Sequence, residues 1–373
     1  MLLVYTLVNT LFILKYGARQ NYLHPFFIIA INVLIFAGIY YGLNFFKERL
    51  NRYKKFTTLY IIFCLSVVLT LIVINLNING ESLDVFRWKG MNTTIGSVLE
   101  GNYPYATFLD LRGDTSSNFP GLFYIGLPFY LLGDVGFLQV FVFLVLSVFI
   151  LKHKTTNYRK LVSISLLLLS APFWWEVFVK SDLMSNVFLL MGFIFWWMEK
   201  YKNDYFKNVP LLALLVAFFL LTRLIVMIPI SLFLFYPFIK TNITNKVKFI
   251  GYLFFFIMVV LIPFILTVPD FDTFLTYNPI SNQTSEAPFF VTVSILASSL
   301  ILSIKSQSVK KIMFHSFFLI IILVSTMFFI NVYEEGLLAN IYGKIVFDIS
   351  YFGMILPFVV FYFLLEDNEP KTI

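Results

Sequence analysis

Long apolar runs without a single charge dominate this sequence and constrain its fold more than any other feature. Residues 56–80 contain no Asp, Glu, Lys or Arg. The hydrocarbon core of a bilayer is about 30 Å thick, so each helical crossing needs roughly 20 apolar residues. Over the whole chain 60% of residues are hydrophobic and 13% are charged, too few charges to cover a soluble fold. The runs therefore predict an all-α, polytopic membrane protein whose solvent is lipid.

The apolar runs predict a bundle of about twelve membrane-spanning helices. Region 208–239 holds one charge, Arg223, and as a single helix it would be roughly 48 Å long. We therefore expect two short spans that turn at Thr222-Arg223. The predicted spans are 2–15, 25–46, 57–79, 121–151, 160–178, 183–199, 208–222, 224–239, 248–268, 288–304, 312–332 and 346–365.

The sequence divides into one membrane domain, 1–373, with a long polar loop inside it. The first three spans occupy 1–79, the loop occupies 80–120, and the remaining spans occupy 121–365. Segment 121–151 is over-long, so we expect a surface-lying piece at 119–133 and then a true span. The N-terminus lacks a basic stretch and a small-residue cleavage site, which favours a retained span over a signal peptide.

Five clusters of basic residues lie between the predicted spans and test the topology. They lie within 47–55, 152–160, 200–207, 240–248 and 305–311. With twelve spans all five fall on one side with Lys371, which places 19 of the 27 basic residues there and leaves 14 of the 20 acids on the other side. The positive-inside rule makes the first side cytoplasmic, with both termini, and Lys15 and Arg19 are the exception. The net charge of +7 therefore indicates membrane anchoring, and we expect no nucleic-acid partner.

Few residues are suited to holding a metal ion. The chain has one cysteine, Cys64, so a disulfide framework and a thiolate cluster are excluded. The three histidines are scattered: His24, His153 and His315. Four loop acids could bind a divalent cation, although no spacing demands it: Asp110, Asp114, Asp270 and Asp272. We expect no metal site, solvated acids are the alternative, and use of a divalent cation stays open.

Polar features gather on the predicted outer side. The loop 80–120 contains aromatics, paired charges and turn formers, so we expect it to be structured and to carry short helices. Three further features lie on the same side: 176–182, the turn at Arg223, and the loop 268–287. A charge at bilayer depth costs roughly 2.5–3.5 kcal/mol, so these groups should face a shared polar cavity.

Three charged residues are the main candidates for chemistry. Asp84 follows the third span closely and is either a general base at the membrane surface or a solvated loop acid. Arg223 interrupts an apolar hairpin and either binds a phosphate or snorkels to the interface. Lys180 either supports that phosphate site or pairs with Asp182 across a short turn.

Residues 84–136 contain a series of motifs: Asp84-Val85, Trp88, Gly101-Asn102-Tyr103-Pro104-Tyr105, Phe119-Pro120-Gly121-Leu122-Phe123-Tyr124 and Pro128. Together they resemble the first outer loop of the GT-C glycosyltransferases, in the bacterial mannosyltransferase-like branch. Ser181-Asp182 and Thr222-Arg223 fit the same layout. Two extra spans precede the loop here, and Trp88 stands where the family usually has Tyr.

The resemblance implies a membrane transferase that makes cell-envelope glycans. Its donor would be a polyprenyl-phosphate sugar, its acceptor a glycan or glycolipid, and its active site on the outer face of the cell membrane. Asp84 would activate the acceptor hydroxyl, with inversion at the anomeric carbon, and Arg223 and Lys180 would bind the departing phosphate. Supporting or substrate-binding roles fall to Trp88, Tyr103, Tyr105, Glu176 and Asp182. The donor is a substrate, and no further cofactor is expected.

Two other functions stay open. A lipid-linked sugar flippase or other transporter would also have about twelve spans, but transporters place binding groups near the midplane on broken helices. Here the span interiors are nearly free of charge and no internal repeat is evident. A polysaccharide polymerase, the second alternative, would normally carry its large loop later in the chain.

Overall fold

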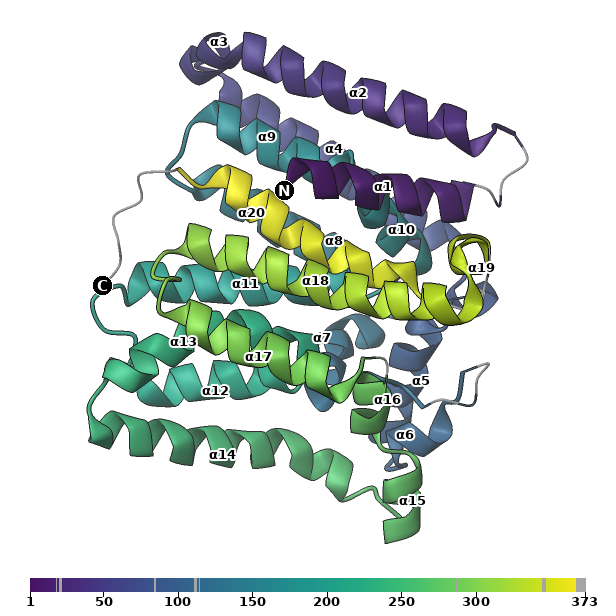
Figure 1. The fold of residues 1–373 in the computed structure, drawn as a ribbon, viewed down its shortest axis with the longest axis vertical. Coiled ribbons are helices and arrows are strands. Elements are labelled where there is room, and N and C mark those ends of the chain that lie inside the picture. Colours follow the sequence, from purple (N-terminus) through teal and green to yellow (C-terminus); the bar gives the residue numbers. More distant parts are fainter. Residues whose placement is uncertain are drawn as a thin grey trace.

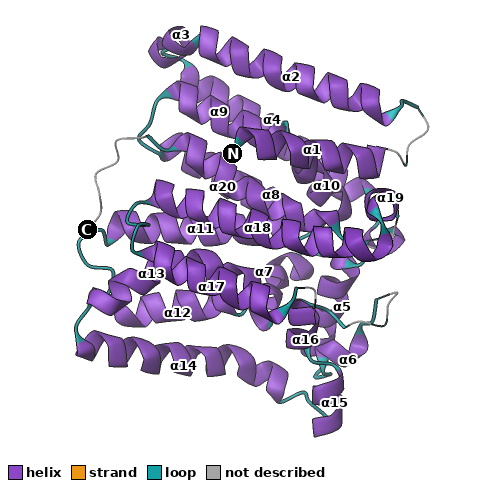
Figure 2. Cartoon of the chain, in the orientation of Figure 1, coloured by secondary structure: helices purple, strands orange, loops and turns teal. Residues whose placement is uncertain are grey.

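The computed structural model of this chain is helical, as the sequence predicts. It describes residues 1–17, 19, 22–83, 85–110, 113, 115–285, 287–343 and 347–366. Within these residues there is no strand, and Leu109 and Thr115 form one isolated β-bridge (Figure 2).

Among the described residues, four helices are long and apolar enough to cross a membrane. They are α2 (Pro25–Phe45), α4 (Phe56–Asn77), α14 (Ile243–Ile265) and α18 (Val309–Glu335). Each coincides with a predicted span, although α14 begins five residues before the predicted 248. No residue of α2 is buried, and α4 and α14 also bury few of their side chains. Such surfaces suit hydrocarbon as the surrounding solvent, so the chain is a membrane protein.

The predicted span at 160–178 is a pair of helices rather than one. Helices α9 (Asn157–Leu168) and α10 (Ala171–Val179) are bent by 55° relative to each other. Pro172 has no N–H with which to continue the helix. The Leu168 carbonyl instead accepts from Trp174 Nε1 at 2.7 Å, and the Ala171 N–H donates to Asn9 Oδ1 at 2.6 Å. The bend is therefore satisfied by side chains.

The remaining predicted apolar segments are shorter helices. They are α1 (Leu2–Gly17), α7 (Pro120–Leu131), α8 (Phe137–Lys152), α11 (Leu183–Lys200), α12 (Val209–Leu220), η2 (Leu224–Val226) with α13 (Met227–Lys240), α17 (Phe289–Ser303), and η3 (Ile349–Ile355) with α20 (Leu356–Leu364). Both predicted breaks are present. Arg223 is extended between α12 and η2, and Gly133, with φ +101°, separates α7 from α8.

The short helices divide between two ends of the bundle (Figure 1). One end, here named the basic end, carries α3 (Lys47–Arg52) and the basic turns before α9 and α18. Hydrogen bonds from Arg159 and Lys310 to the Leu365 carbonyl join these turns. The opposite end, here named the loop-helix end, carries the remaining short helices: η1 (Gly80–Ser82), α5 (Arg87–Leu99), α6 (Pro104–Thr107), α15 (Phe271–Thr276), α16 (Pro279–Ser285) and α19 (Leu337–Tyr342).

The Pro120-Gly121 segment enters the bundle against the end of α12. Gly121 N donates to the Leu221 carbonyl at 2.6 Å, and Phe119 N donates to the Thr222 carbonyl at 3.3 Å. These bonds satisfy carbonyls that the end of a helix leaves free. They also fix the loop beside Arg223.

Replacing Gly121 by alanine is expected to destabilise the protein. An added Cβ would lie 2.5 Å from the Phe218 carbonyl oxygen and 2.7 Å from that of Leu221, both backbone atoms. Overpacking of this kind costs about 1–3 kcal/mol, and it should lower the melting temperature of the purified protein in detergent. Gly251→Ala is the control, because nothing lies within 4 Å of its added Cβ. Equal melting temperatures for the two variants would contradict the close approach.

Candidate functional site

Arg223 and Asp182 form a buried ion pair at the loop-helix end. Arg223 Nη2 lies 2.6 Å and Nε 3.1 Å from Asp182 Oδ2, and the two side chains are 6% and 2% exposed. Arg223 Nη2 also donates to Asn118 Oδ1 at 2.6 Å. Arg223 Nη1 has a longer bond, 3.4 Å, to Ser117 Oγ. The guanidinium thus joins the loop before α7, the α10–α11 turn and the α12–η2 turn.

Gln283 of α16 closes this arrangement from a fourth segment. Its Oε1 accepts from Leu224 N at 2.6 Å, and its Nε2 donates to the Ser117 carbonyl. Helix α16 therefore packs across the peptide that follows Arg223. The Arg223 side chain is 6% exposed, whereas the sequence predicts that it faces a polar cavity open to water.

Lys180 belongs to a second ion pair, with Asp134, and not to a pair with Asp182. Lys180 is the one described non-glycine residue with positive φ, at 52°, and its Nζ contacts Asp134 Oδ2. Asp134 Oδ1 accepts from Trp88 Nε1 at 2.8 Å, and Lys180 Nζ lies 5.9 Å from the centre of a Trp88 ring. The alternative pairing of Lys180 with Asp182 does not form, because Lys180 pairs with Asp134 and Asp182 pairs with Arg223.

A third ion pair, between Arg87 and Asp348, holds the start of α5. Arg87 Nη2 lies 2.5 Å from Asp348 Oδ2 and 3.1 Å from Ser350 Oγ. Burial alone would lower the pKa of Arg87, but Asp348, with smaller contributions from Tyr351 and Asp182, outweighs burial and raises it. The effect of Asp182 on Arg87 links the first and third ion pairs electrostatically.

The predicted aromatic residues of the first outer loop are buried in its packing. Tyr105 donates from its hydroxyl to the Asn118 carbonyl at 2.9 Å, and Tyr103 donates to the Tyr277 carbonyl at 3.3 Å. Both pack with Trp88 and with Phe123 in one apolar cluster. These contacts connect α5, α6, α7 and the 268–287 loop. They give Tyr103 and Tyr105 a positioning role, and neither phenol is open to a substrate.

Glu176, in α10, accepts hydrogen bonds from the start of the next helix, α11. Its Oε2 accepts from Met184 N at 2.7 Å, and its Oε1 accepts from Ser185 N at 2.8 Å and Ser185 Oγ at 2.7 Å. These N–H groups belong to the first turn of α11, where backbone N–H groups have no acceptor within the helix. A carboxylate there also suits the helix dipole. Glu176 therefore caps α11 and supports the α10–α11 turn that presents Lys180 and Asp182.

Asp84, the predicted general base, lies outside the described residues, as does Asp114. The described link from η1 to α5 therefore ends at Leu83 and resumes at Val85. Among the described residues, no group of three His, Cys, Asp or Glu side chains is placed to hold a metal ion. Asp270 instead caps α15, accepting from Thr273 N at 2.7 Å.

Comparison with family models, with curated proteins and with solved structures found no match to this chain. The GT-C resemblance therefore rests on the sequence motifs alone.

The three ion pairs, Arg223–Asp182, Lys180–Asp134 and Arg87–Asp348, and the residues bonded to them are here named the ion-pair cluster. Several residues of this cluster are absent from the sequence-based prediction. They are Arg87, Asn118, Asp134, Gln283 and Asp348. Arg87 had a usable signal, because it lies three residues after Asp84 in the same loop. Asp134 follows Gly133 at a predicted span boundary. Asn118, Gln283 and Asp348 lie far apart in sequence, two in loops and Gln283 in the short helix α16, and nothing in their local pattern indicates their partners.

Proposed function

We propose that this chain is a membrane glycosyltransferase that uses a polyprenyl-phosphate sugar as its donor. The observation that carries the proposal is the group of three ion pairs at the loop-helix end, in which the Arg223–Asp182 pair is buried and the other two pairs are partly buried. Each contains a cation that the first outer loop or the α10–α13 segments supply. Transfer from a lipid phosphate needs cations where negative charge develops on the leaving group. The attraction between these cations and the phosphate is stronger in a site with little water.

The proposed orientation places this cluster on the non-cytoplasmic face. We infer twelve crossings, with α9 and α10 as one broken crossing and both termini at the basic end. The basic turns gather at the end opposite the ion-pair cluster (Figure 1), and the positive-inside rule assigns such an end to the cytoplasm. Of the two exceptions in the sequence, Lys15 and Arg19, Lys15 is buried and donates to the Phe347 carbonyl at 2.7 Å, so it is not a free cation on the proposed outer side.

The proposed reaction forms one bond and breaks one bond at the anomeric carbon. Asp84 accepts the proton of the acceptor hydroxyl, whose oxygen attacks the anomeric carbon from the face opposite the phosphate. The bond from that carbon to the phosphate oxygen breaks, and the polyprenyl phosphate leaves with the electron pair, which inverts the centre. A positioned base and nearby cations are the main requirements, because phosphate is already a competent leaving group.

Arg223 and Lys180 are the proposed phosphate-binding groups. Arg223 Nη1 suits this role best, since its only bond to a described residue is the 3.4 Å contact with Ser117. The remaining guanidinium nitrogens are held by Asp182 and Asn118, which fix the direction in which Nη1 points. Arg87 adds a third cation close to Asp84 in the sequence.

A transporter or flippase is the second candidate, and the bent α9–α10 pair favours it. Broken helices with polar groups near the break are typical of transporter binding sites. However, the break at Leu169-Ser170 is closed by Trp174 and Asn9, and the acidic Glu176 is fully engaged in capping α11. These bonds occupy Trp174, Asn9 and Glu176, and among the described residues at the break Ser170 contributes a hydroxyl without a hydrogen-bond partner but no charge.

Mass spectrometry of the lipid that co-purifies with the protein tests the proposal. We expect a polyprenyl phosphate carrying one sugar, and transfer of that sugar to an acceptor in a reconstituted assay. Protein from a host that lacks polyprenyl-phosphate sugars is the control and should carry none. A lipid-linked oligosaccharide that crosses vesicles without transfer would support the flippase and contradict the transferase.

A further inference from the structure

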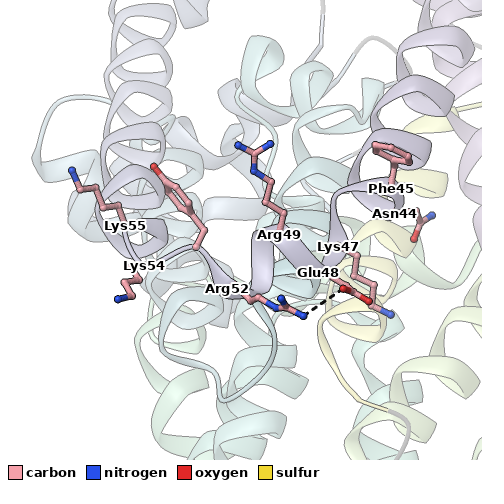
Figure 3. A pocket seen from close by; sticks show the side chains of 9 residues that line it. Asn44, Phe45, Lys47, Glu48, Arg49, Arg52, Lys54 and Lys55 are labelled. Carbon is pink, nitrogen blue, oxygen red and sulfur yellow. Dashed lines mark ion pairs between the residues drawn. The ribbon is translucent and has the colours of Figure 1, made fainter.

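A basic hollow lies at the turn between α2 and α4, far from the ion-pair cluster. Its volume is about 1010 Å³, and its charged lining consists of Lys47, Glu48, Arg49, Arg52, Lys54 and Lys55 (Figure 3). In this view Lys54 and Lys55 lie to one side of Arg49, and Lys47 and Phe45 lie to the other. One carboxylate against five cations leaves the hollow strongly positive.

An apolar hollow adjoins the basic one along the same helices. Its volume is about 470 Å³, and its lining includes Phe46, Leu59, Phe63 and Leu161. Arg49 and Tyr53 line both hollows. A positive region therefore leads directly into a hydrophobic groove between α2 and α4.

Three other basic residues at the same end already have protein partners. Arg159, Lys160 and Lys310 donate to backbone carbonyls and so have protein partners. The side chains of Arg49, Lys54 and Lys55, in contrast, have no hydrogen bond or ion pair with any described residue. Arg52 reaches only Glu48, at 3.6 Å, in a pair that is more than four-fifths exposed.

The frame of the hollow is fixed to the bundle. Asn157 Nδ2 donates to the Leu50 carbonyl at 3.2 Å, and Tyr158 N donates to Asn51 Oδ1 at 3.0 Å. Lys47 Nζ lies 5.4 Å from the centre of the Tyr158 ring. Helix α3 is thus held against α9, and the hollow does not depend on a loose turn.

We propose that the two hollows together bind an anionic lipid, with its phosphate head group among the cations and an acyl chain in the apolar groove. Arginine and lysine bind phosphate oxygens through charge-assisted hydrogen bonds. Basic pockets beside transmembrane helices on the cytoplasmic side recognise anionic head groups in this way. In the proposed orientation the lipid belongs to the cytoplasmic leaflet, so this site is separate from the proposed transfer site.

The test measures lipid binding by the full-length protein in neutral detergent, by native mass spectrometry. We expect dioleoyl phosphatidylglycerol to bind more tightly than dioleoyl phosphatidylcholine. The triple variant Arg49→Ala/Lys54→Ala/Lys55→Ala should lose roughly 100-fold in affinity for phosphatidylglycerol, since each basic residue near the head group contributes about a factor of five. Lys152→Ala/Lys154→Ala/Lys202→Ala is the matched control, with the same charge loss outside both hollows, and should change affinity less than twofold.

Two further measurements separate a lipid from a soluble anion. Leu59→Trp, which fills the apolar groove, should weaken binding of dioleoyl phosphatidylglycerol but leave the short-chain dihexanoyl lipid unchanged. Glycerol 3-phosphate should not displace the long-chain lipid; displacement at equal concentration would replace the lipid by a free phosphate ligand and overturn the proposal. Equal affinity for the two dioleoyl lipids, or equal losses in both triple variants, would also overturn it. If the triple variant fails to fold, the single variant Arg49→Glu gives the same comparison.

Discussion

Replacing Arg223 by alanine is expected to lower the apparent melting temperature of the purified protein sharply. The change leaves the Asp182 carboxylate, 2% exposed, without its cation, and Asn118 Oδ1 without a donor. Breaking a buried ion pair by removing one partner costs about 3–5 kcal/mol. Arg52→Ala is the control, because the exposed Arg52–Glu48 pair contributes little. Similar melting temperatures for the two variants would contradict a structural role for the buried pair.

A double variant separates the structural role of Arg223 from its proposed phosphate role. Arg223→Met combined with Asp182→Leu removes both charges and leaves neither unpaired, so much of the stability should return. If Arg223 binds the donor phosphate, this stable double variant should still have a raised KM for the donor. A stable double variant with an unchanged donor KM and unchanged kcat would assign Arg223 to structure alone.

Arg223 also shows how much of the fold can be predicted from the sequence. A single charge in a mainly apolar segment of 32 residues predicts a turn, because one helix of that length would be too long for the bilayer, and the structure has that turn. The same reasoning placed the break at Gly133 correctly, where a positive φ favours glycine. It missed the bend near Ser170, since no charge marks it. The signal there is Pro172, which removes one helical N–H.

The partners within the site were less predictable than its location. The sequence brought Lys180, Asp182 and Arg223 to one end of the bundle, and all three are there. It could not decide between a Lys180–Asp182 pair and separate pairs, because that choice depends on one left-handed residue and on two loops more than 40 residues away. Long-range pairs such as Arg87 with Asp348 have no local pattern, and only the packed fold brings them together.

Replacing Asp84 by asparagine is expected to reduce the rate of sugar transfer by about 10²–10⁴-fold, the usual contribution of a general base. The amide keeps the size of the side chain but cannot accept the proton of the acceptor hydroxyl. The measurement is transfer of radiolabelled sugar from the polyprenyl-phosphate donor in proteoliposomes. Glu81→Gln is the matched control, since this exposed carboxylate lies in η1 of the same loop, and it should transfer sugar at the wild-type rate.

The pH dependence of transfer distinguishes a base from a binding group. For the wild-type protein the rate should fall at acidic pH as the base gains a proton, and Asp84→Asn should remove this acidic limb along with most of the rate. Two described residues on either side of Asp84 in the sequence have fixed contacts: Leu83 packs against the apolar cluster of Trp88, and Arg87 is bound to Asp348. If Asp84→Asn transferred sugar normally, the base would be another acid of the cluster, and Asp182 would be tested next because its Oδ1 is buried without a described partner.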